Sequence, residues 1–379
     1  MPLKVLIVPD KFKGTLTAQA AAELIAQGWR QIRAEDSVEL LPMTDGGDGF
    51  GEVLSRLLSA NLKSTPTIDA AHRPINAAWW WEPNRQMALI ESARVIGLAL
   101  LPPKQYHPFD LDTAGLNAVI QAALDSGAKR LLIGIGGSAT NDGGFGLAKS
   151  LNWAFVDQHQ KPIEKWTELD SLKRIIPPPQ SLARTEITVA VDVQNPLLGE
   201  VGASRIYGPQ KGLRSEDMPH AEACLGRLAD VVQQDLGIMT ALEPGAGAAG
   251  GLGFGLRTFL NARLESGFKL FAQYACLEER IRAAQLVITG EGAIDVSTLM
   301  GKGVGEVASL CRNRGVPCVG IAGAALLSEE QRLANDKFHF VRGIAPELTS
   351  AAEAKQNPSY WLPRLAAEAA TEWTERNGK

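Results

Sequence analysis

Features that are scarce in this 379-residue sequence exclude whole classes of protein. Four cysteines occur without any CxxC pair, so we expect reduced thiols in the cytoplasm rather than a disulfide framework. No apolar run approaches the roughly 18 residues of a membrane span, and the run at residues 5–8 is too short for a signal sequence. With a formal net charge of −4 there is no broad cationic face, and we expect neither a nucleic-acid nor a membrane partner.

Several catalytic motifs are missing as well. The five histidines are scattered without zinc spacing, and no GxSxG elbow is present, so nothing favours a hydrolase. No GxxxxGK[ST] motif occurs, which argues against a P-loop fold. The HRD and DFG motifs of protein kinases are absent too.

What the sequence does contain is an alternation of strand-length apolar runs with segments of helical periodicity. This pattern predicts an α/β fold with a largely parallel sheet, and the length favours two domains. The expected helices are residues 21–32 behind an N-cap at Thr17, 50–58 with Asp48 as a candidate cap, 145–151 and 254–264. The expected strands are residues 5–8, 38–41, 77–81, 87–91, 131–135, 187–191, 286–289, 319–322 and 338–341.

The two ends of the chain resemble each other more than they resemble the middle, which is rich in tryptophan, proline and glycine loops. We therefore expect the end strands to share one sheet. The predicted division is a discontinuous domain of residues 1–68 plus 287–379, with a second α/β domain of residues 69–286 inserted into it. The active site is expected between the two domains.

A glycine-rich stretch at residues 134–144 follows the predicted strand 131–135. Glycine loops at the start of a helix present backbone N–H groups that bind phosphate. The candidate phosphate-binding residues are Gly136, Gly137, Ser138, Thr140 and Asn141, whose short polar side chains add donors.

A second glycine-rich stretch, residues 245–250, matches GxGxxG and raises the alternative of a dinucleotide-binding enzyme. The preceding residues 235–244 lack a strand pattern, and the motif lies far along the chain rather than at a first strand-to-helix turn. A turn that allows close packing before a helix is the favoured interpretation.

Carboxylates follow several of the predicted strands, where open α/β sheets bind their ligands. Such acids can hold Mg²⁺ or accept a proton, and lysines in glycine-rich loops can neutralise phosphate oxygens. The acids are Asp10, Asp45, Asp48, Asp192 and Glu291, and the lysines are Lys13, Lys211 and Lys302.

Taken together, these residues resemble the type 1 glycerate kinase family. The matching blocks occur in family order and cover most of the chain. They lie within residues 9–14, 45–47, 134–144, 192–199, 208–212, 245–251 and 289–302, the last including Glu291, Asp295, Gly301 and Lys302.

The resemblance implies a Rossmann-like or flavodoxin-like domain with an inserted α/β domain, ATP and Mg²⁺ as cosubstrate and cofactor, and D-glycerate as acceptor. It implies 2-phosphoglycerate as product, with 3-phosphoglycerate less expected; a homo-oligomer is left open. Three positions depart from the family pattern: Ala293 and Ser297 stand where a basic residue and a glutamine are common, and Asn117 where a glycine is common.

Phosphoryl transfer requires a base or positioning acid near the acceptor hydroxyl, charge neutralisation and exclusion of water. We assign the first role to Asp192. Lys13 and Lys211 are candidates for binding the glycerate carboxylate or the phosphates, and Asp10, Asp45, Asp48, Glu291 and Asp295 for substrate or metal. Two rivals remain: an NAD-dependent oxidoreductase of a small hydroxy acid, and a non-enzymatic binding protein for small organic acids.

Overall fold

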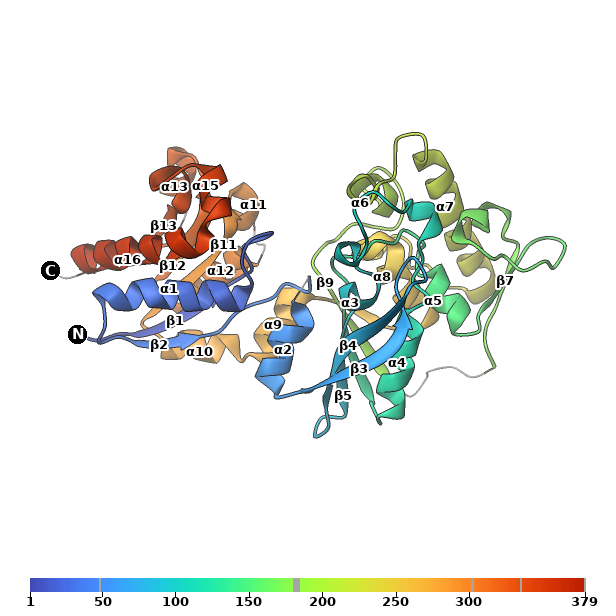
Figure 1. The fold of residues 1–379 in the computed structure, drawn as a ribbon, viewed down its shortest axis with the longest axis horizontal. Coiled ribbons are helices and arrows are strands. Elements are labelled where there is room, and N and C mark those ends of the chain that lie inside the picture. The colour runs from blue at the N-terminus through green and yellow to red at the C-terminus, as the bar shows by residue number, and fades with distance from the viewer. Residues whose placement is uncertain (48, 180–184, 301–302, 335, 378–379) are drawn as a thin grey trace. The chain divides into compact units, whose positions relative to one another are not determined.

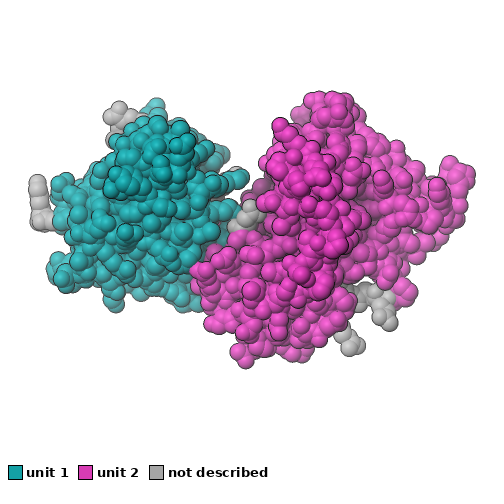
Figure 2. Space-filling model, in the orientation of Figure 1, with its two compact units in different colours: residues 1–45, 271–379 teal, residues 46–270 magenta. Residues whose placement is uncertain are grey.

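A computed structural model describes residues 1–47, 49–179, 185–300, 303–334 and 336–377. The chain forms two compact units, residues 1–45 with 271–379 (unit 1) and residues 46–270 (unit 2), coloured separately in Figure 2. The sequence prediction divided the chain at residues 68 and 287 instead. In the described part of the chain, no helix combines the length and apolar character that a membrane crossing requires. All four cysteines are free.

Unit 1 contains a parallel five-stranded sheet with the order β13-β12-β11-β1-β2 (Figure 1). Its strands are β1 (Lys4–Pro9), β2 (Ser37–Leu40), β11 (Leu286–Ile294), β12 (Cys318–Ala325) and β13 (Phe340–Gly343). β1 pairs with β11 from Val5↔Leu286 to Pro9↔Gly290, so the expectation that the two ends of the chain share one sheet is confirmed.

Helices cover this sheet because alternate strand residues point to opposite faces. Val5 and Ile7 share a buried core with Ile25 of α1 and Leu365 of α16, and Figure 1 shows these two helices along the sheet. Thr17 caps α1 as expected, since its side chain accepts a hydrogen bond from Ala20 N at 3.1 Å. The helices associated with this unit are α1 (Ala18–Ile32), α9 (Gly267–Tyr274, across the boundary), α10 (Leu277–Ala283), α11 (Val296–Leu299), α12 (Val304–Arg314), α13 (Glu329–Ala334), α14 (Ile344–Glu347), α15 (Ala351–Gln356) and α16 (Pro358–Asn377).

Unit 2 is built on a mixed six-stranded sheet with the order β10-β9-β6-β5-β4-β3. β4 runs antiparallel to its neighbours β3 and β5, and β5, β6, β9 and β10 run parallel. The strands are β3 (Asn61–Ile68), β4 (Pro74–Glu82), β5 (Met87–Glu91), β6 (Arg130–Gly134), β9 (Glu186–Val191) and β10 (Arg263–Ser266), and a separate antiparallel pair is formed by β7 (Ala154–Val156) and β8 (Arg174–Ile176).

Helices of unit 2 pack on this sheet around one large buried core. They are α2 (Phe50–Leu58), α3 (Ala93–Ile96), η1 (Leu98–Leu100), η2 (Pro108–Asp110), α4 (Leu116–Asp125), α5 (Phe145–Ser150), η3 (Trp166–Ser171), α6 (Ala203–Lys211), α7 (Met218–Leu236) and α8 (Ala248–Phe259). The expected helix 254–264 was wrong at its end. Asn261 adopts φ 53° in the left-handed region, which breaks the helix, and β10 begins at Arg263.

Strand order determines where ligands are expected in each unit. In unit 1 the connections leave β1 and β11 toward opposite edges, and the carboxyl ends of these two strands are where such sheets bind ligands. In unit 2 the carboxyl ends of β5, β6 and β9 lie side by side. Gly46 packs against Ala190 near the end of β9, and Gly47 packs against Gly136 after β6. Residues 46–47 therefore lie at the carboxyl edge of the unit 2 sheet.

Candidate active site

The glycine-rich residues 134–144, called here the 134–144 loop, leave the carboxyl end of buried β6. A Cβ added to Gly136 would lie 2.6 Å from the Cα of Gly47, so only glycine allows this close approach. Gly137 adopts φ 76° and its carbonyl accepts a hydrogen bond from Leu98 N at 2.9 Å. The loop is therefore held in a defined conformation by its neighbours.

Lys211 reaches this loop from the last position of α6, which ends at Gly212 with φ 108°. Its ammonium donates to Ser138 Oγ at 2.9 Å and to the Thr140 carbonyl at 2.7 Å. The residue is 7% exposed, and burial lowers the pKa of the Lys211 ammonium to about 7, against the opposing charge of Asp142. Among the described residues, no carboxylate forms an ion pair with it, so an anionic ligand would supply a missing partner.

Two further side chains of the loop carry buried polar atoms that lack a partner among the described residues. Thr140 and Asn141 are both 0% exposed, and neither Thr140 Oγ1 nor Asn141 Oδ1 makes a hydrogen bond. The amide nitrogen of Asn141 donates to Ser204 Oγ at 2.9 Å near the start of α6. Since buried polar groups are normally paired, these two atoms indicate a place where a ligand or water completes the structure.

The GxGxxG stretch, residues 245–250, packs closely against the backbone of the 134–144 loop. Ala249, Gly250 and Gly251 all have positive φ, and a Cβ on Gly250 would lie 1.9 Å from the Thr140 carbonyl oxygen. The segment follows α7 and irregular chain rather than a strand, so it does not have the context of a dinucleotide-binding turn. The packing interpretation of residues 245–250 accounts for these contacts.

Asp192 directly follows β9 and is exposed at the carboxyl edge of the unit 2 sheet. It lies close enough to Tyr207 that burial and the Asp192 charge together raise the pKa of the Tyr207 hydroxyl to about 12. The Tyr207 hydroxyl donates to Asn195 Oδ1 at 2.6 Å, which orders the turn after Asp192.

In unit 1, acids gather at the carboxyl ends of β1 and β11. Burial and the neighbouring charge of Asp45 raise the pKa of Asp10 to about 7, with Glu291 adding to the effect, while Lys11 opposes it. Lys11 Nζ lies 3.9 Å from Asp45 Oδ1. Lys13 is exposed, and its backbone packs near Gly292.

The structure gives two of the other acids local structural partners. Glu291 Oε1 accepts a hydrogen bond from Thr298 Oγ1 at 2.7 Å. Asp295 is the N-cap of α11 and accepts hydrogen bonds from Ser297 N at 2.8 Å and Ser297 Oγ at 2.6 Å. Asp48, Gly301 and Lys302 lie outside the described residues.

The three departures from the family pattern have ordinary local surroundings. Ala293 pairs with Ala324 in the β11–β12 ladder. Ser297 supports the Asp295 cap, and Asn117 Nδ2 donates to the Ser150 carbonyl at 2.7 Å, joining α4 to the end of α5.

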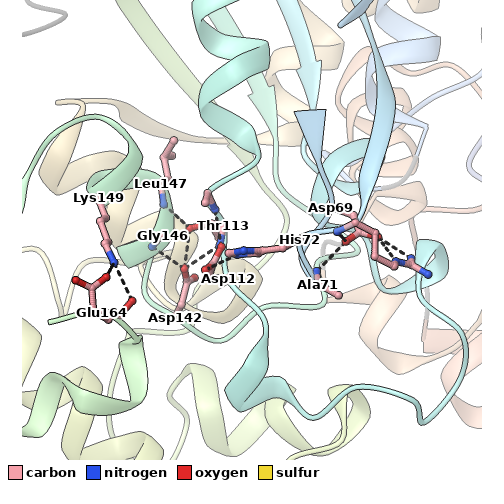
Figure 3. A network of polar contacts seen from close by, with 12 residues as sticks. Asp69, Ala71, His72, Asp112, Thr113, Asp142, Gly146, Leu147, Lys149 and Glu164 are labelled. Atoms are coloured by element: carbon pink, nitrogen blue, oxygen red, sulfur yellow. Dashed lines mark hydrogen bonds and ion pairs between the residues drawn. The ribbon is translucent and has the colours of Figure 1, made fainter. Parts of the chain in front are cut away.

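Two carboxylates at this edge of unit 2 were not selected from the sequence. Glu91 ends β5, is 4% exposed, and accepts hydrogen bonds from Gly49 N at 2.6 Å and Arg94 Nε at 3.1 Å. Its position as the last residue of the predicted strand 87–91 was the available signal. Asp142 lies inside the 134–144 loop and is fully buried in a network of donors (Figure 3), and no sequence pattern distinguishes it from the other loop residues.

Mg²⁺ is usually bound through one or two carboxylates together with substrate phosphates, rather than by an all-protein cage. Among the residues that the structure describes, no group of three or more histidines, cysteines or acids is arranged to hold a metal ion. Burial and then the repulsion from Asp45 raise the pKa of Asp10, and a divalent cation would relieve that repulsion. Asp10 and Asp45 therefore fit a magnesium ion that arrives with a nucleotide.

An open depression of about 920 Å³ lies elsewhere on unit 2, near β10. Four of its five charged side chains form two ion pairs: Arg263 with Glu186, and Arg257 Nε with Glu243 Oε2 at 3.1 Å. Because no candidate residue lines it and most of its charged side chains are paired, we do not place the chemistry there.

Comparison with known proteins identifies the family of the chain. The family model described as "Glycerate kinase family" matches residues 5–374. The glycerate kinase of Halalkalibacterium halodurans is 35% identical over 367 residues, covering 96% of each chain, and the glycerate 2-kinase of Escherichia coli K12 is 36% identical over 327 residues, covering 85% of each. A crystal structure of a candidate glycerate kinase 2 from Salmonella typhimurium LT2 superposes with a TM-score of 0.82, at 32% identity and full coverage of both chains. The chain is a kinase and belongs to the glycerate kinase family.

Proposed function

We propose that this kinase transfers the γ-phosphoryl group of ATP to a hydroxyl of D-glycerate and forms 2-phosphoglycerate and ADP. The observation that carries the proposal is the buried Lys211 ammonium at the 134–144 loop, hydrogen-bonded to Ser138 and Thr140 but without an ion-pair partner among the described residues. Such a cation suits an anion with several oxygens, a phosphate or a carboxylate. The name of the Escherichia coli relative, glycerate 2-kinase, favours the 2-phosphorylated product.

In this proposal Asp192 accepts the proton of the glycerate hydroxyl as its oxygen attacks the γ-phosphorus. The bond from phosphorus to the β–γ bridging oxygen breaks, and ADP leaves with that oxygen. Lys211, Gly136, Gly137 and the polar side chains of the 134–144 loop bind phosphate oxygens, and Lys13 is a candidate for the glycerate carboxylate. Mg²⁺ would neutralise charge on the nucleotide phosphates, with Asp10 and Asp45 as its protein ligands.

The oxidoreductase alternative has little support, because residues 245–250 do not follow a strand. The binding-protein alternative is replaced by the kinase family assignment. A cytoplasmic location is retained as part of the proposal, since ATP, the proposed donor, is supplied there.

The experiment is a coupled assay of ADP formation by the purified protein, with and without D-glycerate. The proposal requires glycerate-dependent ADP formation and a 2-phosphoglycerate signal in phosphorus NMR of the product. Formation of 3-phosphoglycerate would correct the regiochemistry, whereas NADH binding without ATP turnover would favour the oxidoreductase.

A further inference from the structure

Asp142 connects three segments of unit 2 through one buried carboxylate. Its Oδ2 accepts hydrogen bonds from Thr113 N at 3.0 Å, Thr113 Oγ1 at 2.7 Å and Gly146 N at 2.9 Å, and its Oδ1 accepts from Gly144 N at 3.2 Å. Thr113 Oγ1 in turn accepts from Leu147 N at 2.9 Å, as Figure 3 shows. The 134–144 loop is thereby tied to the residues before α4 and to the first turn of α5.

The same carboxylate bears the charge that acts on Lys211. Burial disfavours the Lys211 ammonium, and the negative charge of Asp142 works against that penalty. Both side chains are buried, and neutral loop atoms, Ser138 Oγ and the Thr140 carbonyl, accept the ammonium hydrogen bonds. A buried ammonium without any opposing charge would tend to lose its proton.

We propose that Asp142 is the positioning residue of the 134–144 loop: without contacting substrate, it fixes the loop conformation and keeps Lys211 charged for an anionic substrate. The inference rests on the proposed function for the identity of that anion. A purely structural role for Asp142 would predict a loss of stability but no change in the protonation of Lys211.

Neighbouring ionisable groups also influence the pKa values of Asp142 and Lys211. Asp112, just before Thr113, repels the Asp142 charge, and His72 Nε2 lies 2.8 Å from Asp112 Oδ2. Lys149 on α5 is paired with Glu164 and so is already neutralised. Burial, with the Asp112 charge, raises the pKa of Asp142 to about 6, and the Asp142 charge opposes the effect of burial on the Lys211 pKa.

The first test is the pH profile of kcat/KM for glycerate in Asp142→Asn, compared with wild type and with Asp157→Asn. Asp157 is a matched control, because it also closes a turn, accepting from His159 N at 2.7 Å and Lys161 N at 2.9 Å, but at an exposed site. Loss of the Asp142 charge should move the alkaline limb, where Lys211 deprotonates, at least one pH unit toward acid. A shift of one unit from a pKa of about 7 lowers the charged fraction of Lys211 at pH 7.5 about eightfold, so kcat/KM at that pH should fall by at least about this factor. Asp157→Asn should stay within twofold of wild type.

If Asp142→Asn folds and the alkaline limb of its pH profile stays at the wild-type position, the proposal is overturned, whatever happens to the rate.

A second variant covers the case in which Asp142→Asn does not fold. Thr113→Val keeps the Asp142 charge and the shape of residue 113, but it removes the 2.7 Å hydroxyl donor to Asp142 and the acceptor of Leu147 N. Amide hydrogen exchange in the 134–144 loop, which excludes Leu147, should become at least about tenfold faster than in the control Thr371→Val, whose hydroxyl bonds within α16. Unchanged exchange there would also overturn the proposal. This readout does not depend on turnover, so it separates failure of the inference from failure of the proposed kinase activity.

Discussion

Replacing Lys211 by methionine should separate the binding role of this side chain from its contribution to stability. Methionine is of similar length and apolar, so the buried stem keeps its packing while the ammonium is removed. Losing one preorganised charged donor typically costs a factor of about 100 to 1,000 in kcat. We therefore expect a fall of that size in kcat/KM for the Lys211→Met variant.

The buried ammonium of Lys211 should also make the stability of the wild-type protein depend on pH. Burial lowers the pKa of Lys211 from 10.5 to about 7, so between these values the unfolded chain binds more protons than the folded one. The free energy of unfolding contributed by this residue consequently rises with pH across that window. At about 1.4 kcal/mol per pH unit, the rise between pH 7 and pH 10 amounts to roughly 3 kcal/mol.

The assay is urea unfolding followed by tryptophan fluorescence at pH 7 and pH 10, alongside steady-state kinetics. Lys211→Met should lack the pH-dependent gain that wild type shows, while Lys149→Met, a half-exposed lysine paired with Glu164, should retain it. If Lys211→Met keeps kcat/KM within about fivefold of wild type, Lys211 does not bind the reacting anion, since loss of such a donor costs far more. If its stability shows the same pH dependence as wild type, the ammonium is not held as the structure implies.

Three further predictions concern other parts of the site. Asp192→Asn should lower kcat by about a hundredfold to ten-thousandfold with little change in the melting temperature, and a fall of less than about fivefold would remove Asp192 from the mechanism. Excess EDTA should abolish ADP formation and added Mg²⁺ should restore it; undiminished turnover in EDTA would exclude a required metal. Gly250→Ala should destabilise the protein by at least about 3 kcal/mol in thermal unfolding, because φ at this position is +71° and the new Cβ would clash with the Thr140 carbonyl oxygen. The control is Gly226→Ala on α7, where a Cβ would meet no atom within 4 Å, and this variant should be as stable as wild type or slightly more stable. A soluble Gly250→Ala variant of normal stability would contradict the close packing of these two loops.

The sheet of unit 1 could be predicted because its three central strands, β12, β11 and β1, are largely buried on both faces and contain short continuous apolar runs. Residues 5–8 and 286–289 lie inside neighbouring strands of one sheet. β3 and β10 were missed for the opposite reason. β3 is a largely exposed edge strand with the sequence NLKSTPTI, and β10 is four residues long, so neither shows a clear apolar pattern.

The candidate site was predictable where chemistry resides in motifs and unpredictable where it depends on burial. Glycine spacing pointed to Ser138 and Thr140, and the structure shows both in contact with Lys211. Nothing in the sequence distinguishes the buried Asp142 from an ordinary turn acid, because its four donors come from residues as far away as Thr113. Asp295, selected from the sequence as a substrate or metal candidate, is the N-cap of α11, and its role as a candidate stays a prediction.

The most direct test of the central claim is the product of the wild-type reaction with ATP, Mg²⁺ and D-glycerate, followed by phosphorus NMR. The account predicts ADP formation that depends on glycerate, with one equivalent of 2-phosphoglycerate formed per ADP. ADP formation that is the same with and without glycerate, or no phosphorylated glycerate at all, would contradict it.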